Sequence, residues 1–209
     1  MPKTLLHLDS SPMEKVSVSR HLTAEFVKNW KDANPDGTVI VRDTTTSAIP
    51  PVTAAWVGAA YTPEAALTPA QRETLALSDT LIAELFAADE YVVGVPMHNF
   101  GIPSTLKLWI DQIARVNKTF SYATGAPVGM LTGKRATILI ATGGWYDAGT
   151  VMASYNHVEP YLRTVLGFLG VTDVTVLAAG GAAALNRGAD RQTFLEPHVA
   201  AVRAQFQPA

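Results

Sequence analysis

Five short runs of consecutive apolar residues recur along the chain, and each is flanked by polar or turn-forming residues. Their Val, Ile and Leu content and their lack of polar alternation are typical of strands buried on both faces, as in a parallel sheet. Strands are therefore predicted over residues 5–8, 38–41, 91–95, 136–141 and 174–178.

Between these runs, apolar residues repeat at the three- and four-residue spacing of an amphipathic helix. Helices are predicted from near residue 19, over about 69–87, around 106–113, around 158–169 and over about 190–205. Asp111 and Arg115 stand four residues apart, so they are expected to form an ion pair on one helix face.

The helix over 69–87 has the clearest start signal. Thr68 and Gln71 have the spacing of a capping box, and Pro69 suits the first helical turn. Its apolar arc is expected to bury Leu75, Leu81, Ile82, Leu85 and Phe86.

Strands that alternate with helices predict an α/β fold. The simplest arrangement is a flavodoxin-like, doubly wound, five-stranded parallel sheet in the order 2-1-3-4-5, with helices on both faces. Residues 49–63 are rich in Pro and Ala and read as a long excursion, and no repeat interrupts the chain, so residues 1–209 are expected to form one domain.

Composition narrows the function classes. Apolar residues make up 48% and charged residues 16%, which suits a compact protein with a large core. The formal net charge of −2, without a basic run, argues against nucleic acid or a membrane surface as partner. The chain has no cysteine, which excludes disulfides, thiolate metal sites and a Cys nucleophile. No apolar run is long enough for a membrane span or a signal peptide, so a cytoplasmic location is expected.

In the predicted strand order, the ligand crevice lies at the carboxyl ends of the first, third and fourth strands. The loop after the first strand carries Ser11, Ser17 and Ser19 and leads into a helix whose first turn holds Arg20. A cation there opposes the helix dipole unless an anion lies in front of it, which favours a phosphate site. The alternative is that a serine only caps the helix and Arg20 is solvated.

The other two loops have backbone features that suit a flat ligand. Residues 96–104 follow the third strand, have Pro at both ends and carry Asn99 and Phe100. Gly143 and Gly144 follow the fourth strand and let backbone N–H groups approach a ligand closely. Taken separately, residues 96–104 could be an ordinary strand-to-helix connection with Phe100 in the core, and the Gly143-Gly144 loop could be only a tight turn. Their shared position beside one crevice favours a binding site.

No dinucleotide-binding glycine motif, nucleophile elbow or zinc motif is present in the sequence, and no metal site is predicted. This absence indicates that a bound cofactor carries any chemistry. Segments in order along nearly the whole chain resemble the FMN-dependent NADH azoreductases, also described as NADH:quinone oxidoreductases. The segments are residues 96–100, 102–107, 119–122, 129–134, 143–144 and 166–170.

The resemblance implies a flavodoxin-like homodimer with FMN at the subunit interface, reduced by NADH. It also implies which residues contact FMN. These are Ser11, Ser17, Val18 and Ser19 at the phosphate, Met97, His98, Asn99 and Phe100 beside the isoalloxazine ring, and Ala141, Thr142, Gly143 and Gly144 near its pyrimidine side.

Two residues depart from the family pattern. His98 stands where the family often has Tyr, and Thr142 where it often has Arg. His98 and Tyr122 are expected to line the substrate pocket, and no side chain is expected to be an indispensable acid.

The expected activity is transfer of two electrons from NADH or NADPH to quinones and azo compounds by a ping-pong mechanism. One alternative is a flavodoxin-type electron carrier without NADH-dependent activity, although such carriers are usually strongly acidic. Another is a flavin-free scaffold with the same fold.

Overall fold

A computed structural model describes residues 2–123 and 125–207. Its main sheet contains five parallel strands in the order β2-β1-β3-β6-β7. Counted along the chain, this is the predicted order 2-1-3-4-5, and each predicted strand is present. The strands are β1 (Thr4–Asp9), β2 (Thr38–Asp43), β3 (Glu90–Pro96), β6 (Arg135–Ala141) and β7 (Asp173–Ala179).

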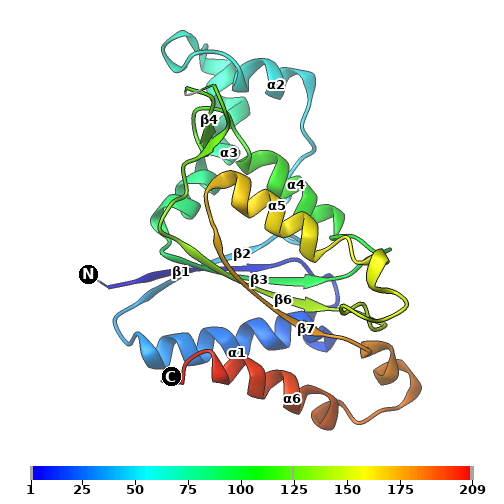
Figure 1. The fold of residues 1–209 in the computed structure, drawn as a ribbon. Coiled ribbons are helices and arrows are strands. Elements are labelled where there is room, and N and C mark those ends of the chain that lie inside the picture. Colours follow the sequence, from blue (N-terminus) through cyan, green and yellow to red (C-terminus); the bar gives the residue numbers. More distant parts are fainter. Residues whose placement is uncertain (1, 124, 208–209) are drawn as a thin grey trace.

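Helices cover both faces of this sheet (Figure 1). One face carries α1 (Val18–Ala33) and α6 (Arg191–Ala204). The other face carries α3 (Pro69–Ala87), α4 (Ser104–Ile113) and α5 (Glu159–Leu169). In the described part of the chain, no helix has the length and apolarity needed to cross a membrane.

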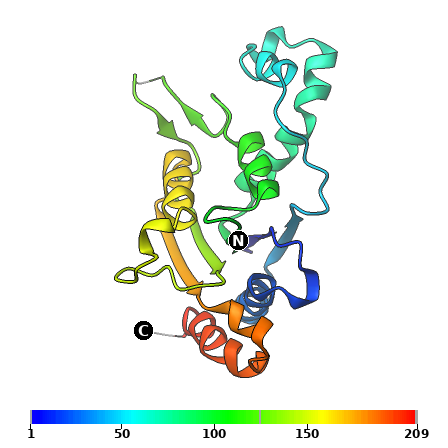
Figure 2. The ribbon, with the colours of Figure 1, turned by 90° about the vertical axis from the view of Figure 1, so that its right-hand side faces the viewer.

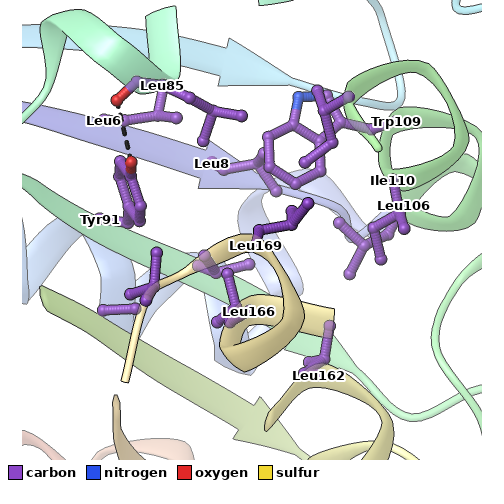
Figure 3. Close-up of a cluster of buried hydrophobic side chains, with 14 of the residues drawn as sticks. Leu6, Leu8, Leu85, Tyr91, Leu106, Trp109, Ile110, Leu162, Leu166 and Leu169 are labelled. Carbon is purple, nitrogen blue, oxygen red and sulfur yellow. Dashed lines mark hydrogen bonds between the residues drawn. The ribbon is translucent and has the colours of Figure 1, made fainter. Parts of the chain in front are cut away.

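The larger part of the core lies between the sheet and the layer of α3, α4 and α5. Leu8, Trp109 and Leu166 meet there (Figure 3). Tyr91 is also buried in this layer, and its hydroxyl donates a hydrogen bond to the Leu85 carbonyl at 2.9 Å. Burial, together with the charge of Asp89, raises the pKa of Tyr91, so this phenol stays neutral and serves packing.

The capping box predicted for α3 is present in full. The Thr68 hydroxyl accepts from the Gln71 backbone N–H at 3.3 Å, and the Gln71 side chain accepts from the Thr68 backbone N–H at 2.9 Å. These bonds satisfy two donors that the first helical turn leaves unpaired, and Pro69 has no N–H to satisfy there. Local sequence therefore accounts for where this helix begins.

Several short elements were not predicted from the sequence. Residues 49–63, interpreted as an excursion, contain α2 (Ala54–Ala60). In addition, β4 (Phe120–Ser121) pairs antiparallel with β5 (Val128–Gly129). The described residues also contain four 3-10 turns: η1 (Glu14–Val16), η2 (Glu64–Ala66), η3 (Ala153–Tyr155) and η4 (Ala182–Arg187).

Two side-chain predictions were wrong. Helix α4 ends at Ile113, so Arg115 is not on the same helix face as Asp111. The Arg115 guanidinium instead lies buried and bonds the Asp79 carboxylate at 2.6 Å, whereas Asp111 pairs with Lys107. Phe86 was expected in the core, but it is 43% exposed, whereas Leu85 beside it in the last turn of α3 is buried.

Candidate functional site

The loops after β1, β3 and β6 meet at the carboxyl ends of the strands, the edge that faces the viewer in Figure 2. Together with the segment after β7, they line an open cavity of about 520 Å³. This volume lies within the range of about 300–1,000 Å³ that is typical of small-molecule sites. Eight of the residues predicted for the site line this cavity: Ser11, Ser17, Val18, Met97, His98, Ala141, Thr142 and Gly143.

The other predicted residues lie elsewhere. Ser19 is fully buried behind Ser17, and the two hydroxyl oxygens are 3.2 Å apart. Asn99 lines a neighbouring cavity of about 800 Å³, which shares His98 with the first. Gly144 lies beside the Tyr146 ring, outside the cavity lining.

The two aromatic residues predicted near the ligand are not in the cavity lining either. Phe100 is 40% exposed and its ring contacts that of Tyr155, with 5.3 Å between centroids, so it is not a core anchor. Tyr122 follows β4 in a hairpin that stands away from the carboxyl ends of the strands (Figure 1). It is 54% exposed and lines neither cavity of its own chain.

The serine-rich loop is held by its own hydroxyl groups. The Ser17 side chain caps α1 by accepting from the Arg20 backbone N–H at 3.2 Å. The Ser11 hydroxyl accepts from the Met13 backbone N–H at 3.3 Å, and Ser10 donates to the Gly94 carbonyl of β3 at 2.7 Å. The last bond ties the loop to the neighbouring strand.

The Arg20 side chain does not face the cavity, and the argument that its charge indicates a bound anion was wrong. Its guanidinium makes two bonds to the Asp43 carboxylate, at 2.7 and 2.9 Å, and a third to the Ser11 carbonyl at 2.7 Å. The bond to Asp43 raises the pKa of Arg20. The anion that offsets this cation is therefore a carboxylate at the end of β2, which sequence spacing does not reveal.

We expect Asp43→Asn to destabilise the protein at neutral pH by roughly 1–2 kcal/mol. Burial acts to raise the pKa of Asp43, but bonds from Arg20 and Thr45 outweigh burial and leave it below its ordinary value of 3.8. A lowered pKa contributes stability at neutral pH, and this contribution is lost as the pH falls through the folded-state value. Urea unfolding at pH 7 and near pH 3 checks this expectation.

The difference in free energy of unfolding between wild type and Asp43→Asn should be smaller at the lower pH. Asp36→Asn, at an exposed turn, serves as the control and should change little at either pH. A cost for Asp43→Asn that is the same at both values would show that the charge of this carboxylate does not matter.

The loop after β3 contains a strained two-residue turn. His98 and Gly101 exchange backbone hydrogen bonds of 2.9 and 3.0 Å, and both residues between them have positive φ, 48° at Asn99 and 70° at Phe100. This is the pattern of a type I′ hairpin turn. Asn tolerates this conformation, but a residue with a large side chain pays roughly 1–2 kcal/mol there. Strain of this kind is concentrated at functional sites, which is consistent with its position beside the cavity.

The loop after β6 is tied to the segment after β7. Ala182 and Ala183 donate backbone hydrogen bonds to the carbonyls of Thr142 and Gly143, at 2.9 and 3.1 Å. The Thr142 hydroxyl donates to the Gly144 carbonyl at 2.8 Å. These bonds hold Gly143 at the cavity wall.

Sequence reasoning missed the wall that follows β7. It consists of Ala182, Ala183, Leu185, Asn186, Ala189 and Arg191. These residues were detectable in principle, because the carboxyl ends of neighbouring parallel strands lie at the same edge of a sheet. The fifth strand was predicted, and the pair Gly180 and Gly181 follows it directly, which is the signal that singled out Gly143 and Gly144 after the fourth strand.

The cavity is nearly neutral. Among the described residues that line it, Arg191 is the only one with a permanently charged side chain. No group of three His, Cys, Asp or Glu side chains placed to hold a metal ion occurs in residues 2–123 and 125–207. The arrangement therefore suits an organic ligand with a phosphate group, held by serine hydroxyls and backbone groups.

Comparisons with known proteins agree with this geometry. Residues 3–206 match a family model described as a flavodoxin-like fold. A protein of Acidobacterium capsulatum named FMN-dependent NADH:quinone oxidoreductase is 58% identical over 201 residues, which cover 96% of this chain and 97% of the relative. A Burkholderia lata protein named FMN-dependent NADH:quinone oxidoreductase 3 is 50% identical over 203 residues, which cover 97% and 98%.

A solved structure is also similar. The crystal structure of the azoreductase AzrA superposes with a TM-score of 0.87 at 26% sequence identity, over 97% of this chain and 98% of that one.

Proposed function

We propose, on the premise that this chain belongs to the flavodoxin-like family of FMN-dependent NADH:quinone oxidoreductases, that it is an enzyme of this kind. It binds FMN and transfers two electrons from NADH to quinones and to azo compounds. NADPH is the alternative donor. Donor and acceptor occupy the same space in turn, which makes the kinetics ping-pong.

One observation carries this proposal: three loops that are far apart in sequence surround a single cavity at the carboxyl edge of the sheet. The cavity brings together the serine-rich start of α1, the segment of Met97 and His98, and Gly143. This is where flat cofactors bind in doubly wound folds.

The residues fit FMN at both of its ends. Hydroxyl groups of Ser11 and Ser17 and the first N–H groups of α1 suit a phosphate. Gly143 has space beside it, because a Cβ placed there would meet only Ala183, at 3.8 Å. A flat ring can therefore approach the backbone closely. FMN, when bound, supplies the group that accepts and passes on the electron pair.

The role of the protein's own residues is to position the cofactor and the substrates. No side chain in the cavity is assigned as an acid or base. Holding donor and cofactor together in the right orientation lowers the barrier to electron transfer, by about 7–11 kcal/mol when the alignment is ideal. The strained turn at Asn99 and Phe100 fixes the loop beside the ring position. His98 lines both cavities, which supports a position between bound FMN and an incoming substrate.

The purified full-length chain should bind FMN, turn yellow and oxidise NADH when a quinone is supplied. Flavin fluorescence titration measures the binding, and absorbance at the NADH band measures turnover. Initial rates at several quinone concentrations should give parallel double-reciprocal plots. FMN binding without NADH oxidation would instead identify an electron carrier. No flavin binding at all would favour a flavin-free scaffold protein.

We also propose that residues 1–209 act as one domain and that the enzyme is a homodimer. Residues 1, 124, 208 and 209 lie outside the described part. The expected pocket role of Tyr122 fits a dimer, because this exposed side chain lines neither cavity of its own chain and would have to reach a pocket of a second copy. Analytical ultracentrifugation tests the assembly state directly.

A further inference from the structure

A phosphate ester brings close to two negative charges into a cavity that is otherwise almost uncharged. Serine hydroxyls and backbone N–H groups bind it without neutralising it. The obvious cation in the sequence, Arg20, is already paired with Asp43. Lys15 is exposed and does not line the cavity.

Arg191 reaches the cavity from a distant part of the chain. It is the first residue of α6, and its guanidinium donates hydrogen bonds to the carbonyls of Val16 and Ser17, at 2.9 and 3.2 Å. These carbonyls belong to the turn that opens α1. The guanidinium is therefore fixed beside the same loop that presents Ser11 and Ser17 to the cavity.

The guanidinium keeps binding capacity after these contacts. It has more N–H donors than the two carbonyl bonds use, and a guanidinium matches the geometry of phosphate oxygens. The neighbouring carboxylate, Asp190, is occupied in capping α6, where it accepts from the Thr193 backbone N–H at 2.8 Å. Asp190 does not line the cavity.

We propose that Arg191 is the residue that makes this cavity select a phosphorylated flavin over an unphosphorylated one. It supplies positive charge to the phosphate, and it holds the loop before α1 in place through its bonds to the carbonyls of Val16 and Ser17. This inference rests on the proposed function, because it assumes that the ligand is a flavin. It assigns a role to the segment after β7, which the sequence motifs did not indicate.

The test is a flavin titration of full-length wild type and Arg191→Gln, using FMN and riboflavin in parallel. Loss of a charge-assisted bond to phosphate should weaken FMN binding about tenfold to a hundredfold. Riboflavin, which has no phosphate, should change less than about threefold. Arg191→Lys keeps the charge and should recover part of the FMN affinity.

Arg203→Gln is the matched control, because Arg203 lies on the same helix, pairs with Glu25 and does not line the cavity. It should leave both affinities unchanged. Equal weakening of FMN and riboflavin in Arg191→Gln would show that Arg191 only braces the loop, and unchanged affinities would show that it has neither role. Both results overturn the proposal.

Salt dependence provides a measurement that needs no variant. In wild type, raising the salt concentration should weaken FMN binding and leave riboflavin binding nearly unchanged, since only the phosphate is charged. The same salt response for both ligands contradicts the proposal. Failure of wild type to bind either flavin would instead refute the proposed function, so the two failures can be told apart.

Discussion

Valine in place of Gly143 is expected to weaken FMN binding by roughly tenfold to a hundredfold and to leave the fold intact. Gly143 lines the cavity, and a Cβ there would meet only the Cβ of Ala183, at an ordinary contact distance of 3.8 Å. Its φ is not in the left-handed region, so valine causes no backbone strain. The two added methyl groups must then occupy space that the ligand needs.

Fluorescence titration with FMN measures this effect, and thermal unfolding of the flavin-free chain checks the fold. Gly144→Ala is the control. A Cβ at Gly144 would lie 3.3 Å from the Tyr146 ring, outside the cavity, so FMN affinity should change less than about threefold. A larger loss for Gly144→Ala than for Gly143→Val would show that the loop is oriented differently toward its ligand.

The largest effect on stability is expected for Gly129→Ala, at about 3 kcal/mol or more. Gly129 is the last residue of β5 and lies against the end of α5. A Cβ there would be 2.1 Å from the backbone nitrogen of Gly170 and 2.2 Å from the carbonyl carbon of Leu169. Backbone atoms cannot turn aside as a side chain can, so hairpin and helix must separate.

The melting temperature of Gly129→Ala should fall by roughly 6–12 °C, measured by circular dichroism. Gly167→Ala makes the same chemical change in α5, where a Cβ meets nothing within 4 Å. That variant should be neutral or gain about 0.5–1 kcal/mol, because alanine restricts the unfolded chain more than glycine does. Similar melting temperatures for the two variants would contradict the packing argument.

Local patterns predicted much of the fold. Continuous apolar runs identified all five strands of the main sheet, and Thr68 with Gln71 identified the start of α3. These predictions succeeded because each depends on residues that are near one another in sequence. The strand order then placed three loops at one edge, and the cavity lies there.

The predictions that failed depended on distant partners. Arg115 was expected to pair within its helix, but it bonds Asp79 of α3 instead. Arg20 was interpreted as a sign of a bound anion, but its partner is Asp43 of another strand. A charged side chain is long enough to reach several elements, so sequence spacing alone does not select among them.

The positive φ values of Asn99 and Phe100 were also beyond sequence reasoning. A phenylalanine disfavours the left-handed conformation, and no local pattern predicts it there. The turn is held by its surroundings, including the bond of 3.1 Å from the His157 backbone N–H to the Phe100 carbonyl. Strain that tertiary contacts maintain becomes visible only in the folded chain.

The amino-acid sequence by itself determined the alternation of strands and helices, the strand order, the family resemblance and the three loops that meet at the cavity. Only the tertiary structure decided which cation lines the cavity: Arg20 pairs with the Asp43 carboxylate, and Arg191 reaches the cavity from the last helix. The physical reason is the distance along the chain over which each interaction acts. Hydrophobic periodicity is a property of neighbouring residues, whereas charge pairing depends on which side chains the completed fold brings within a few ångströms of each other.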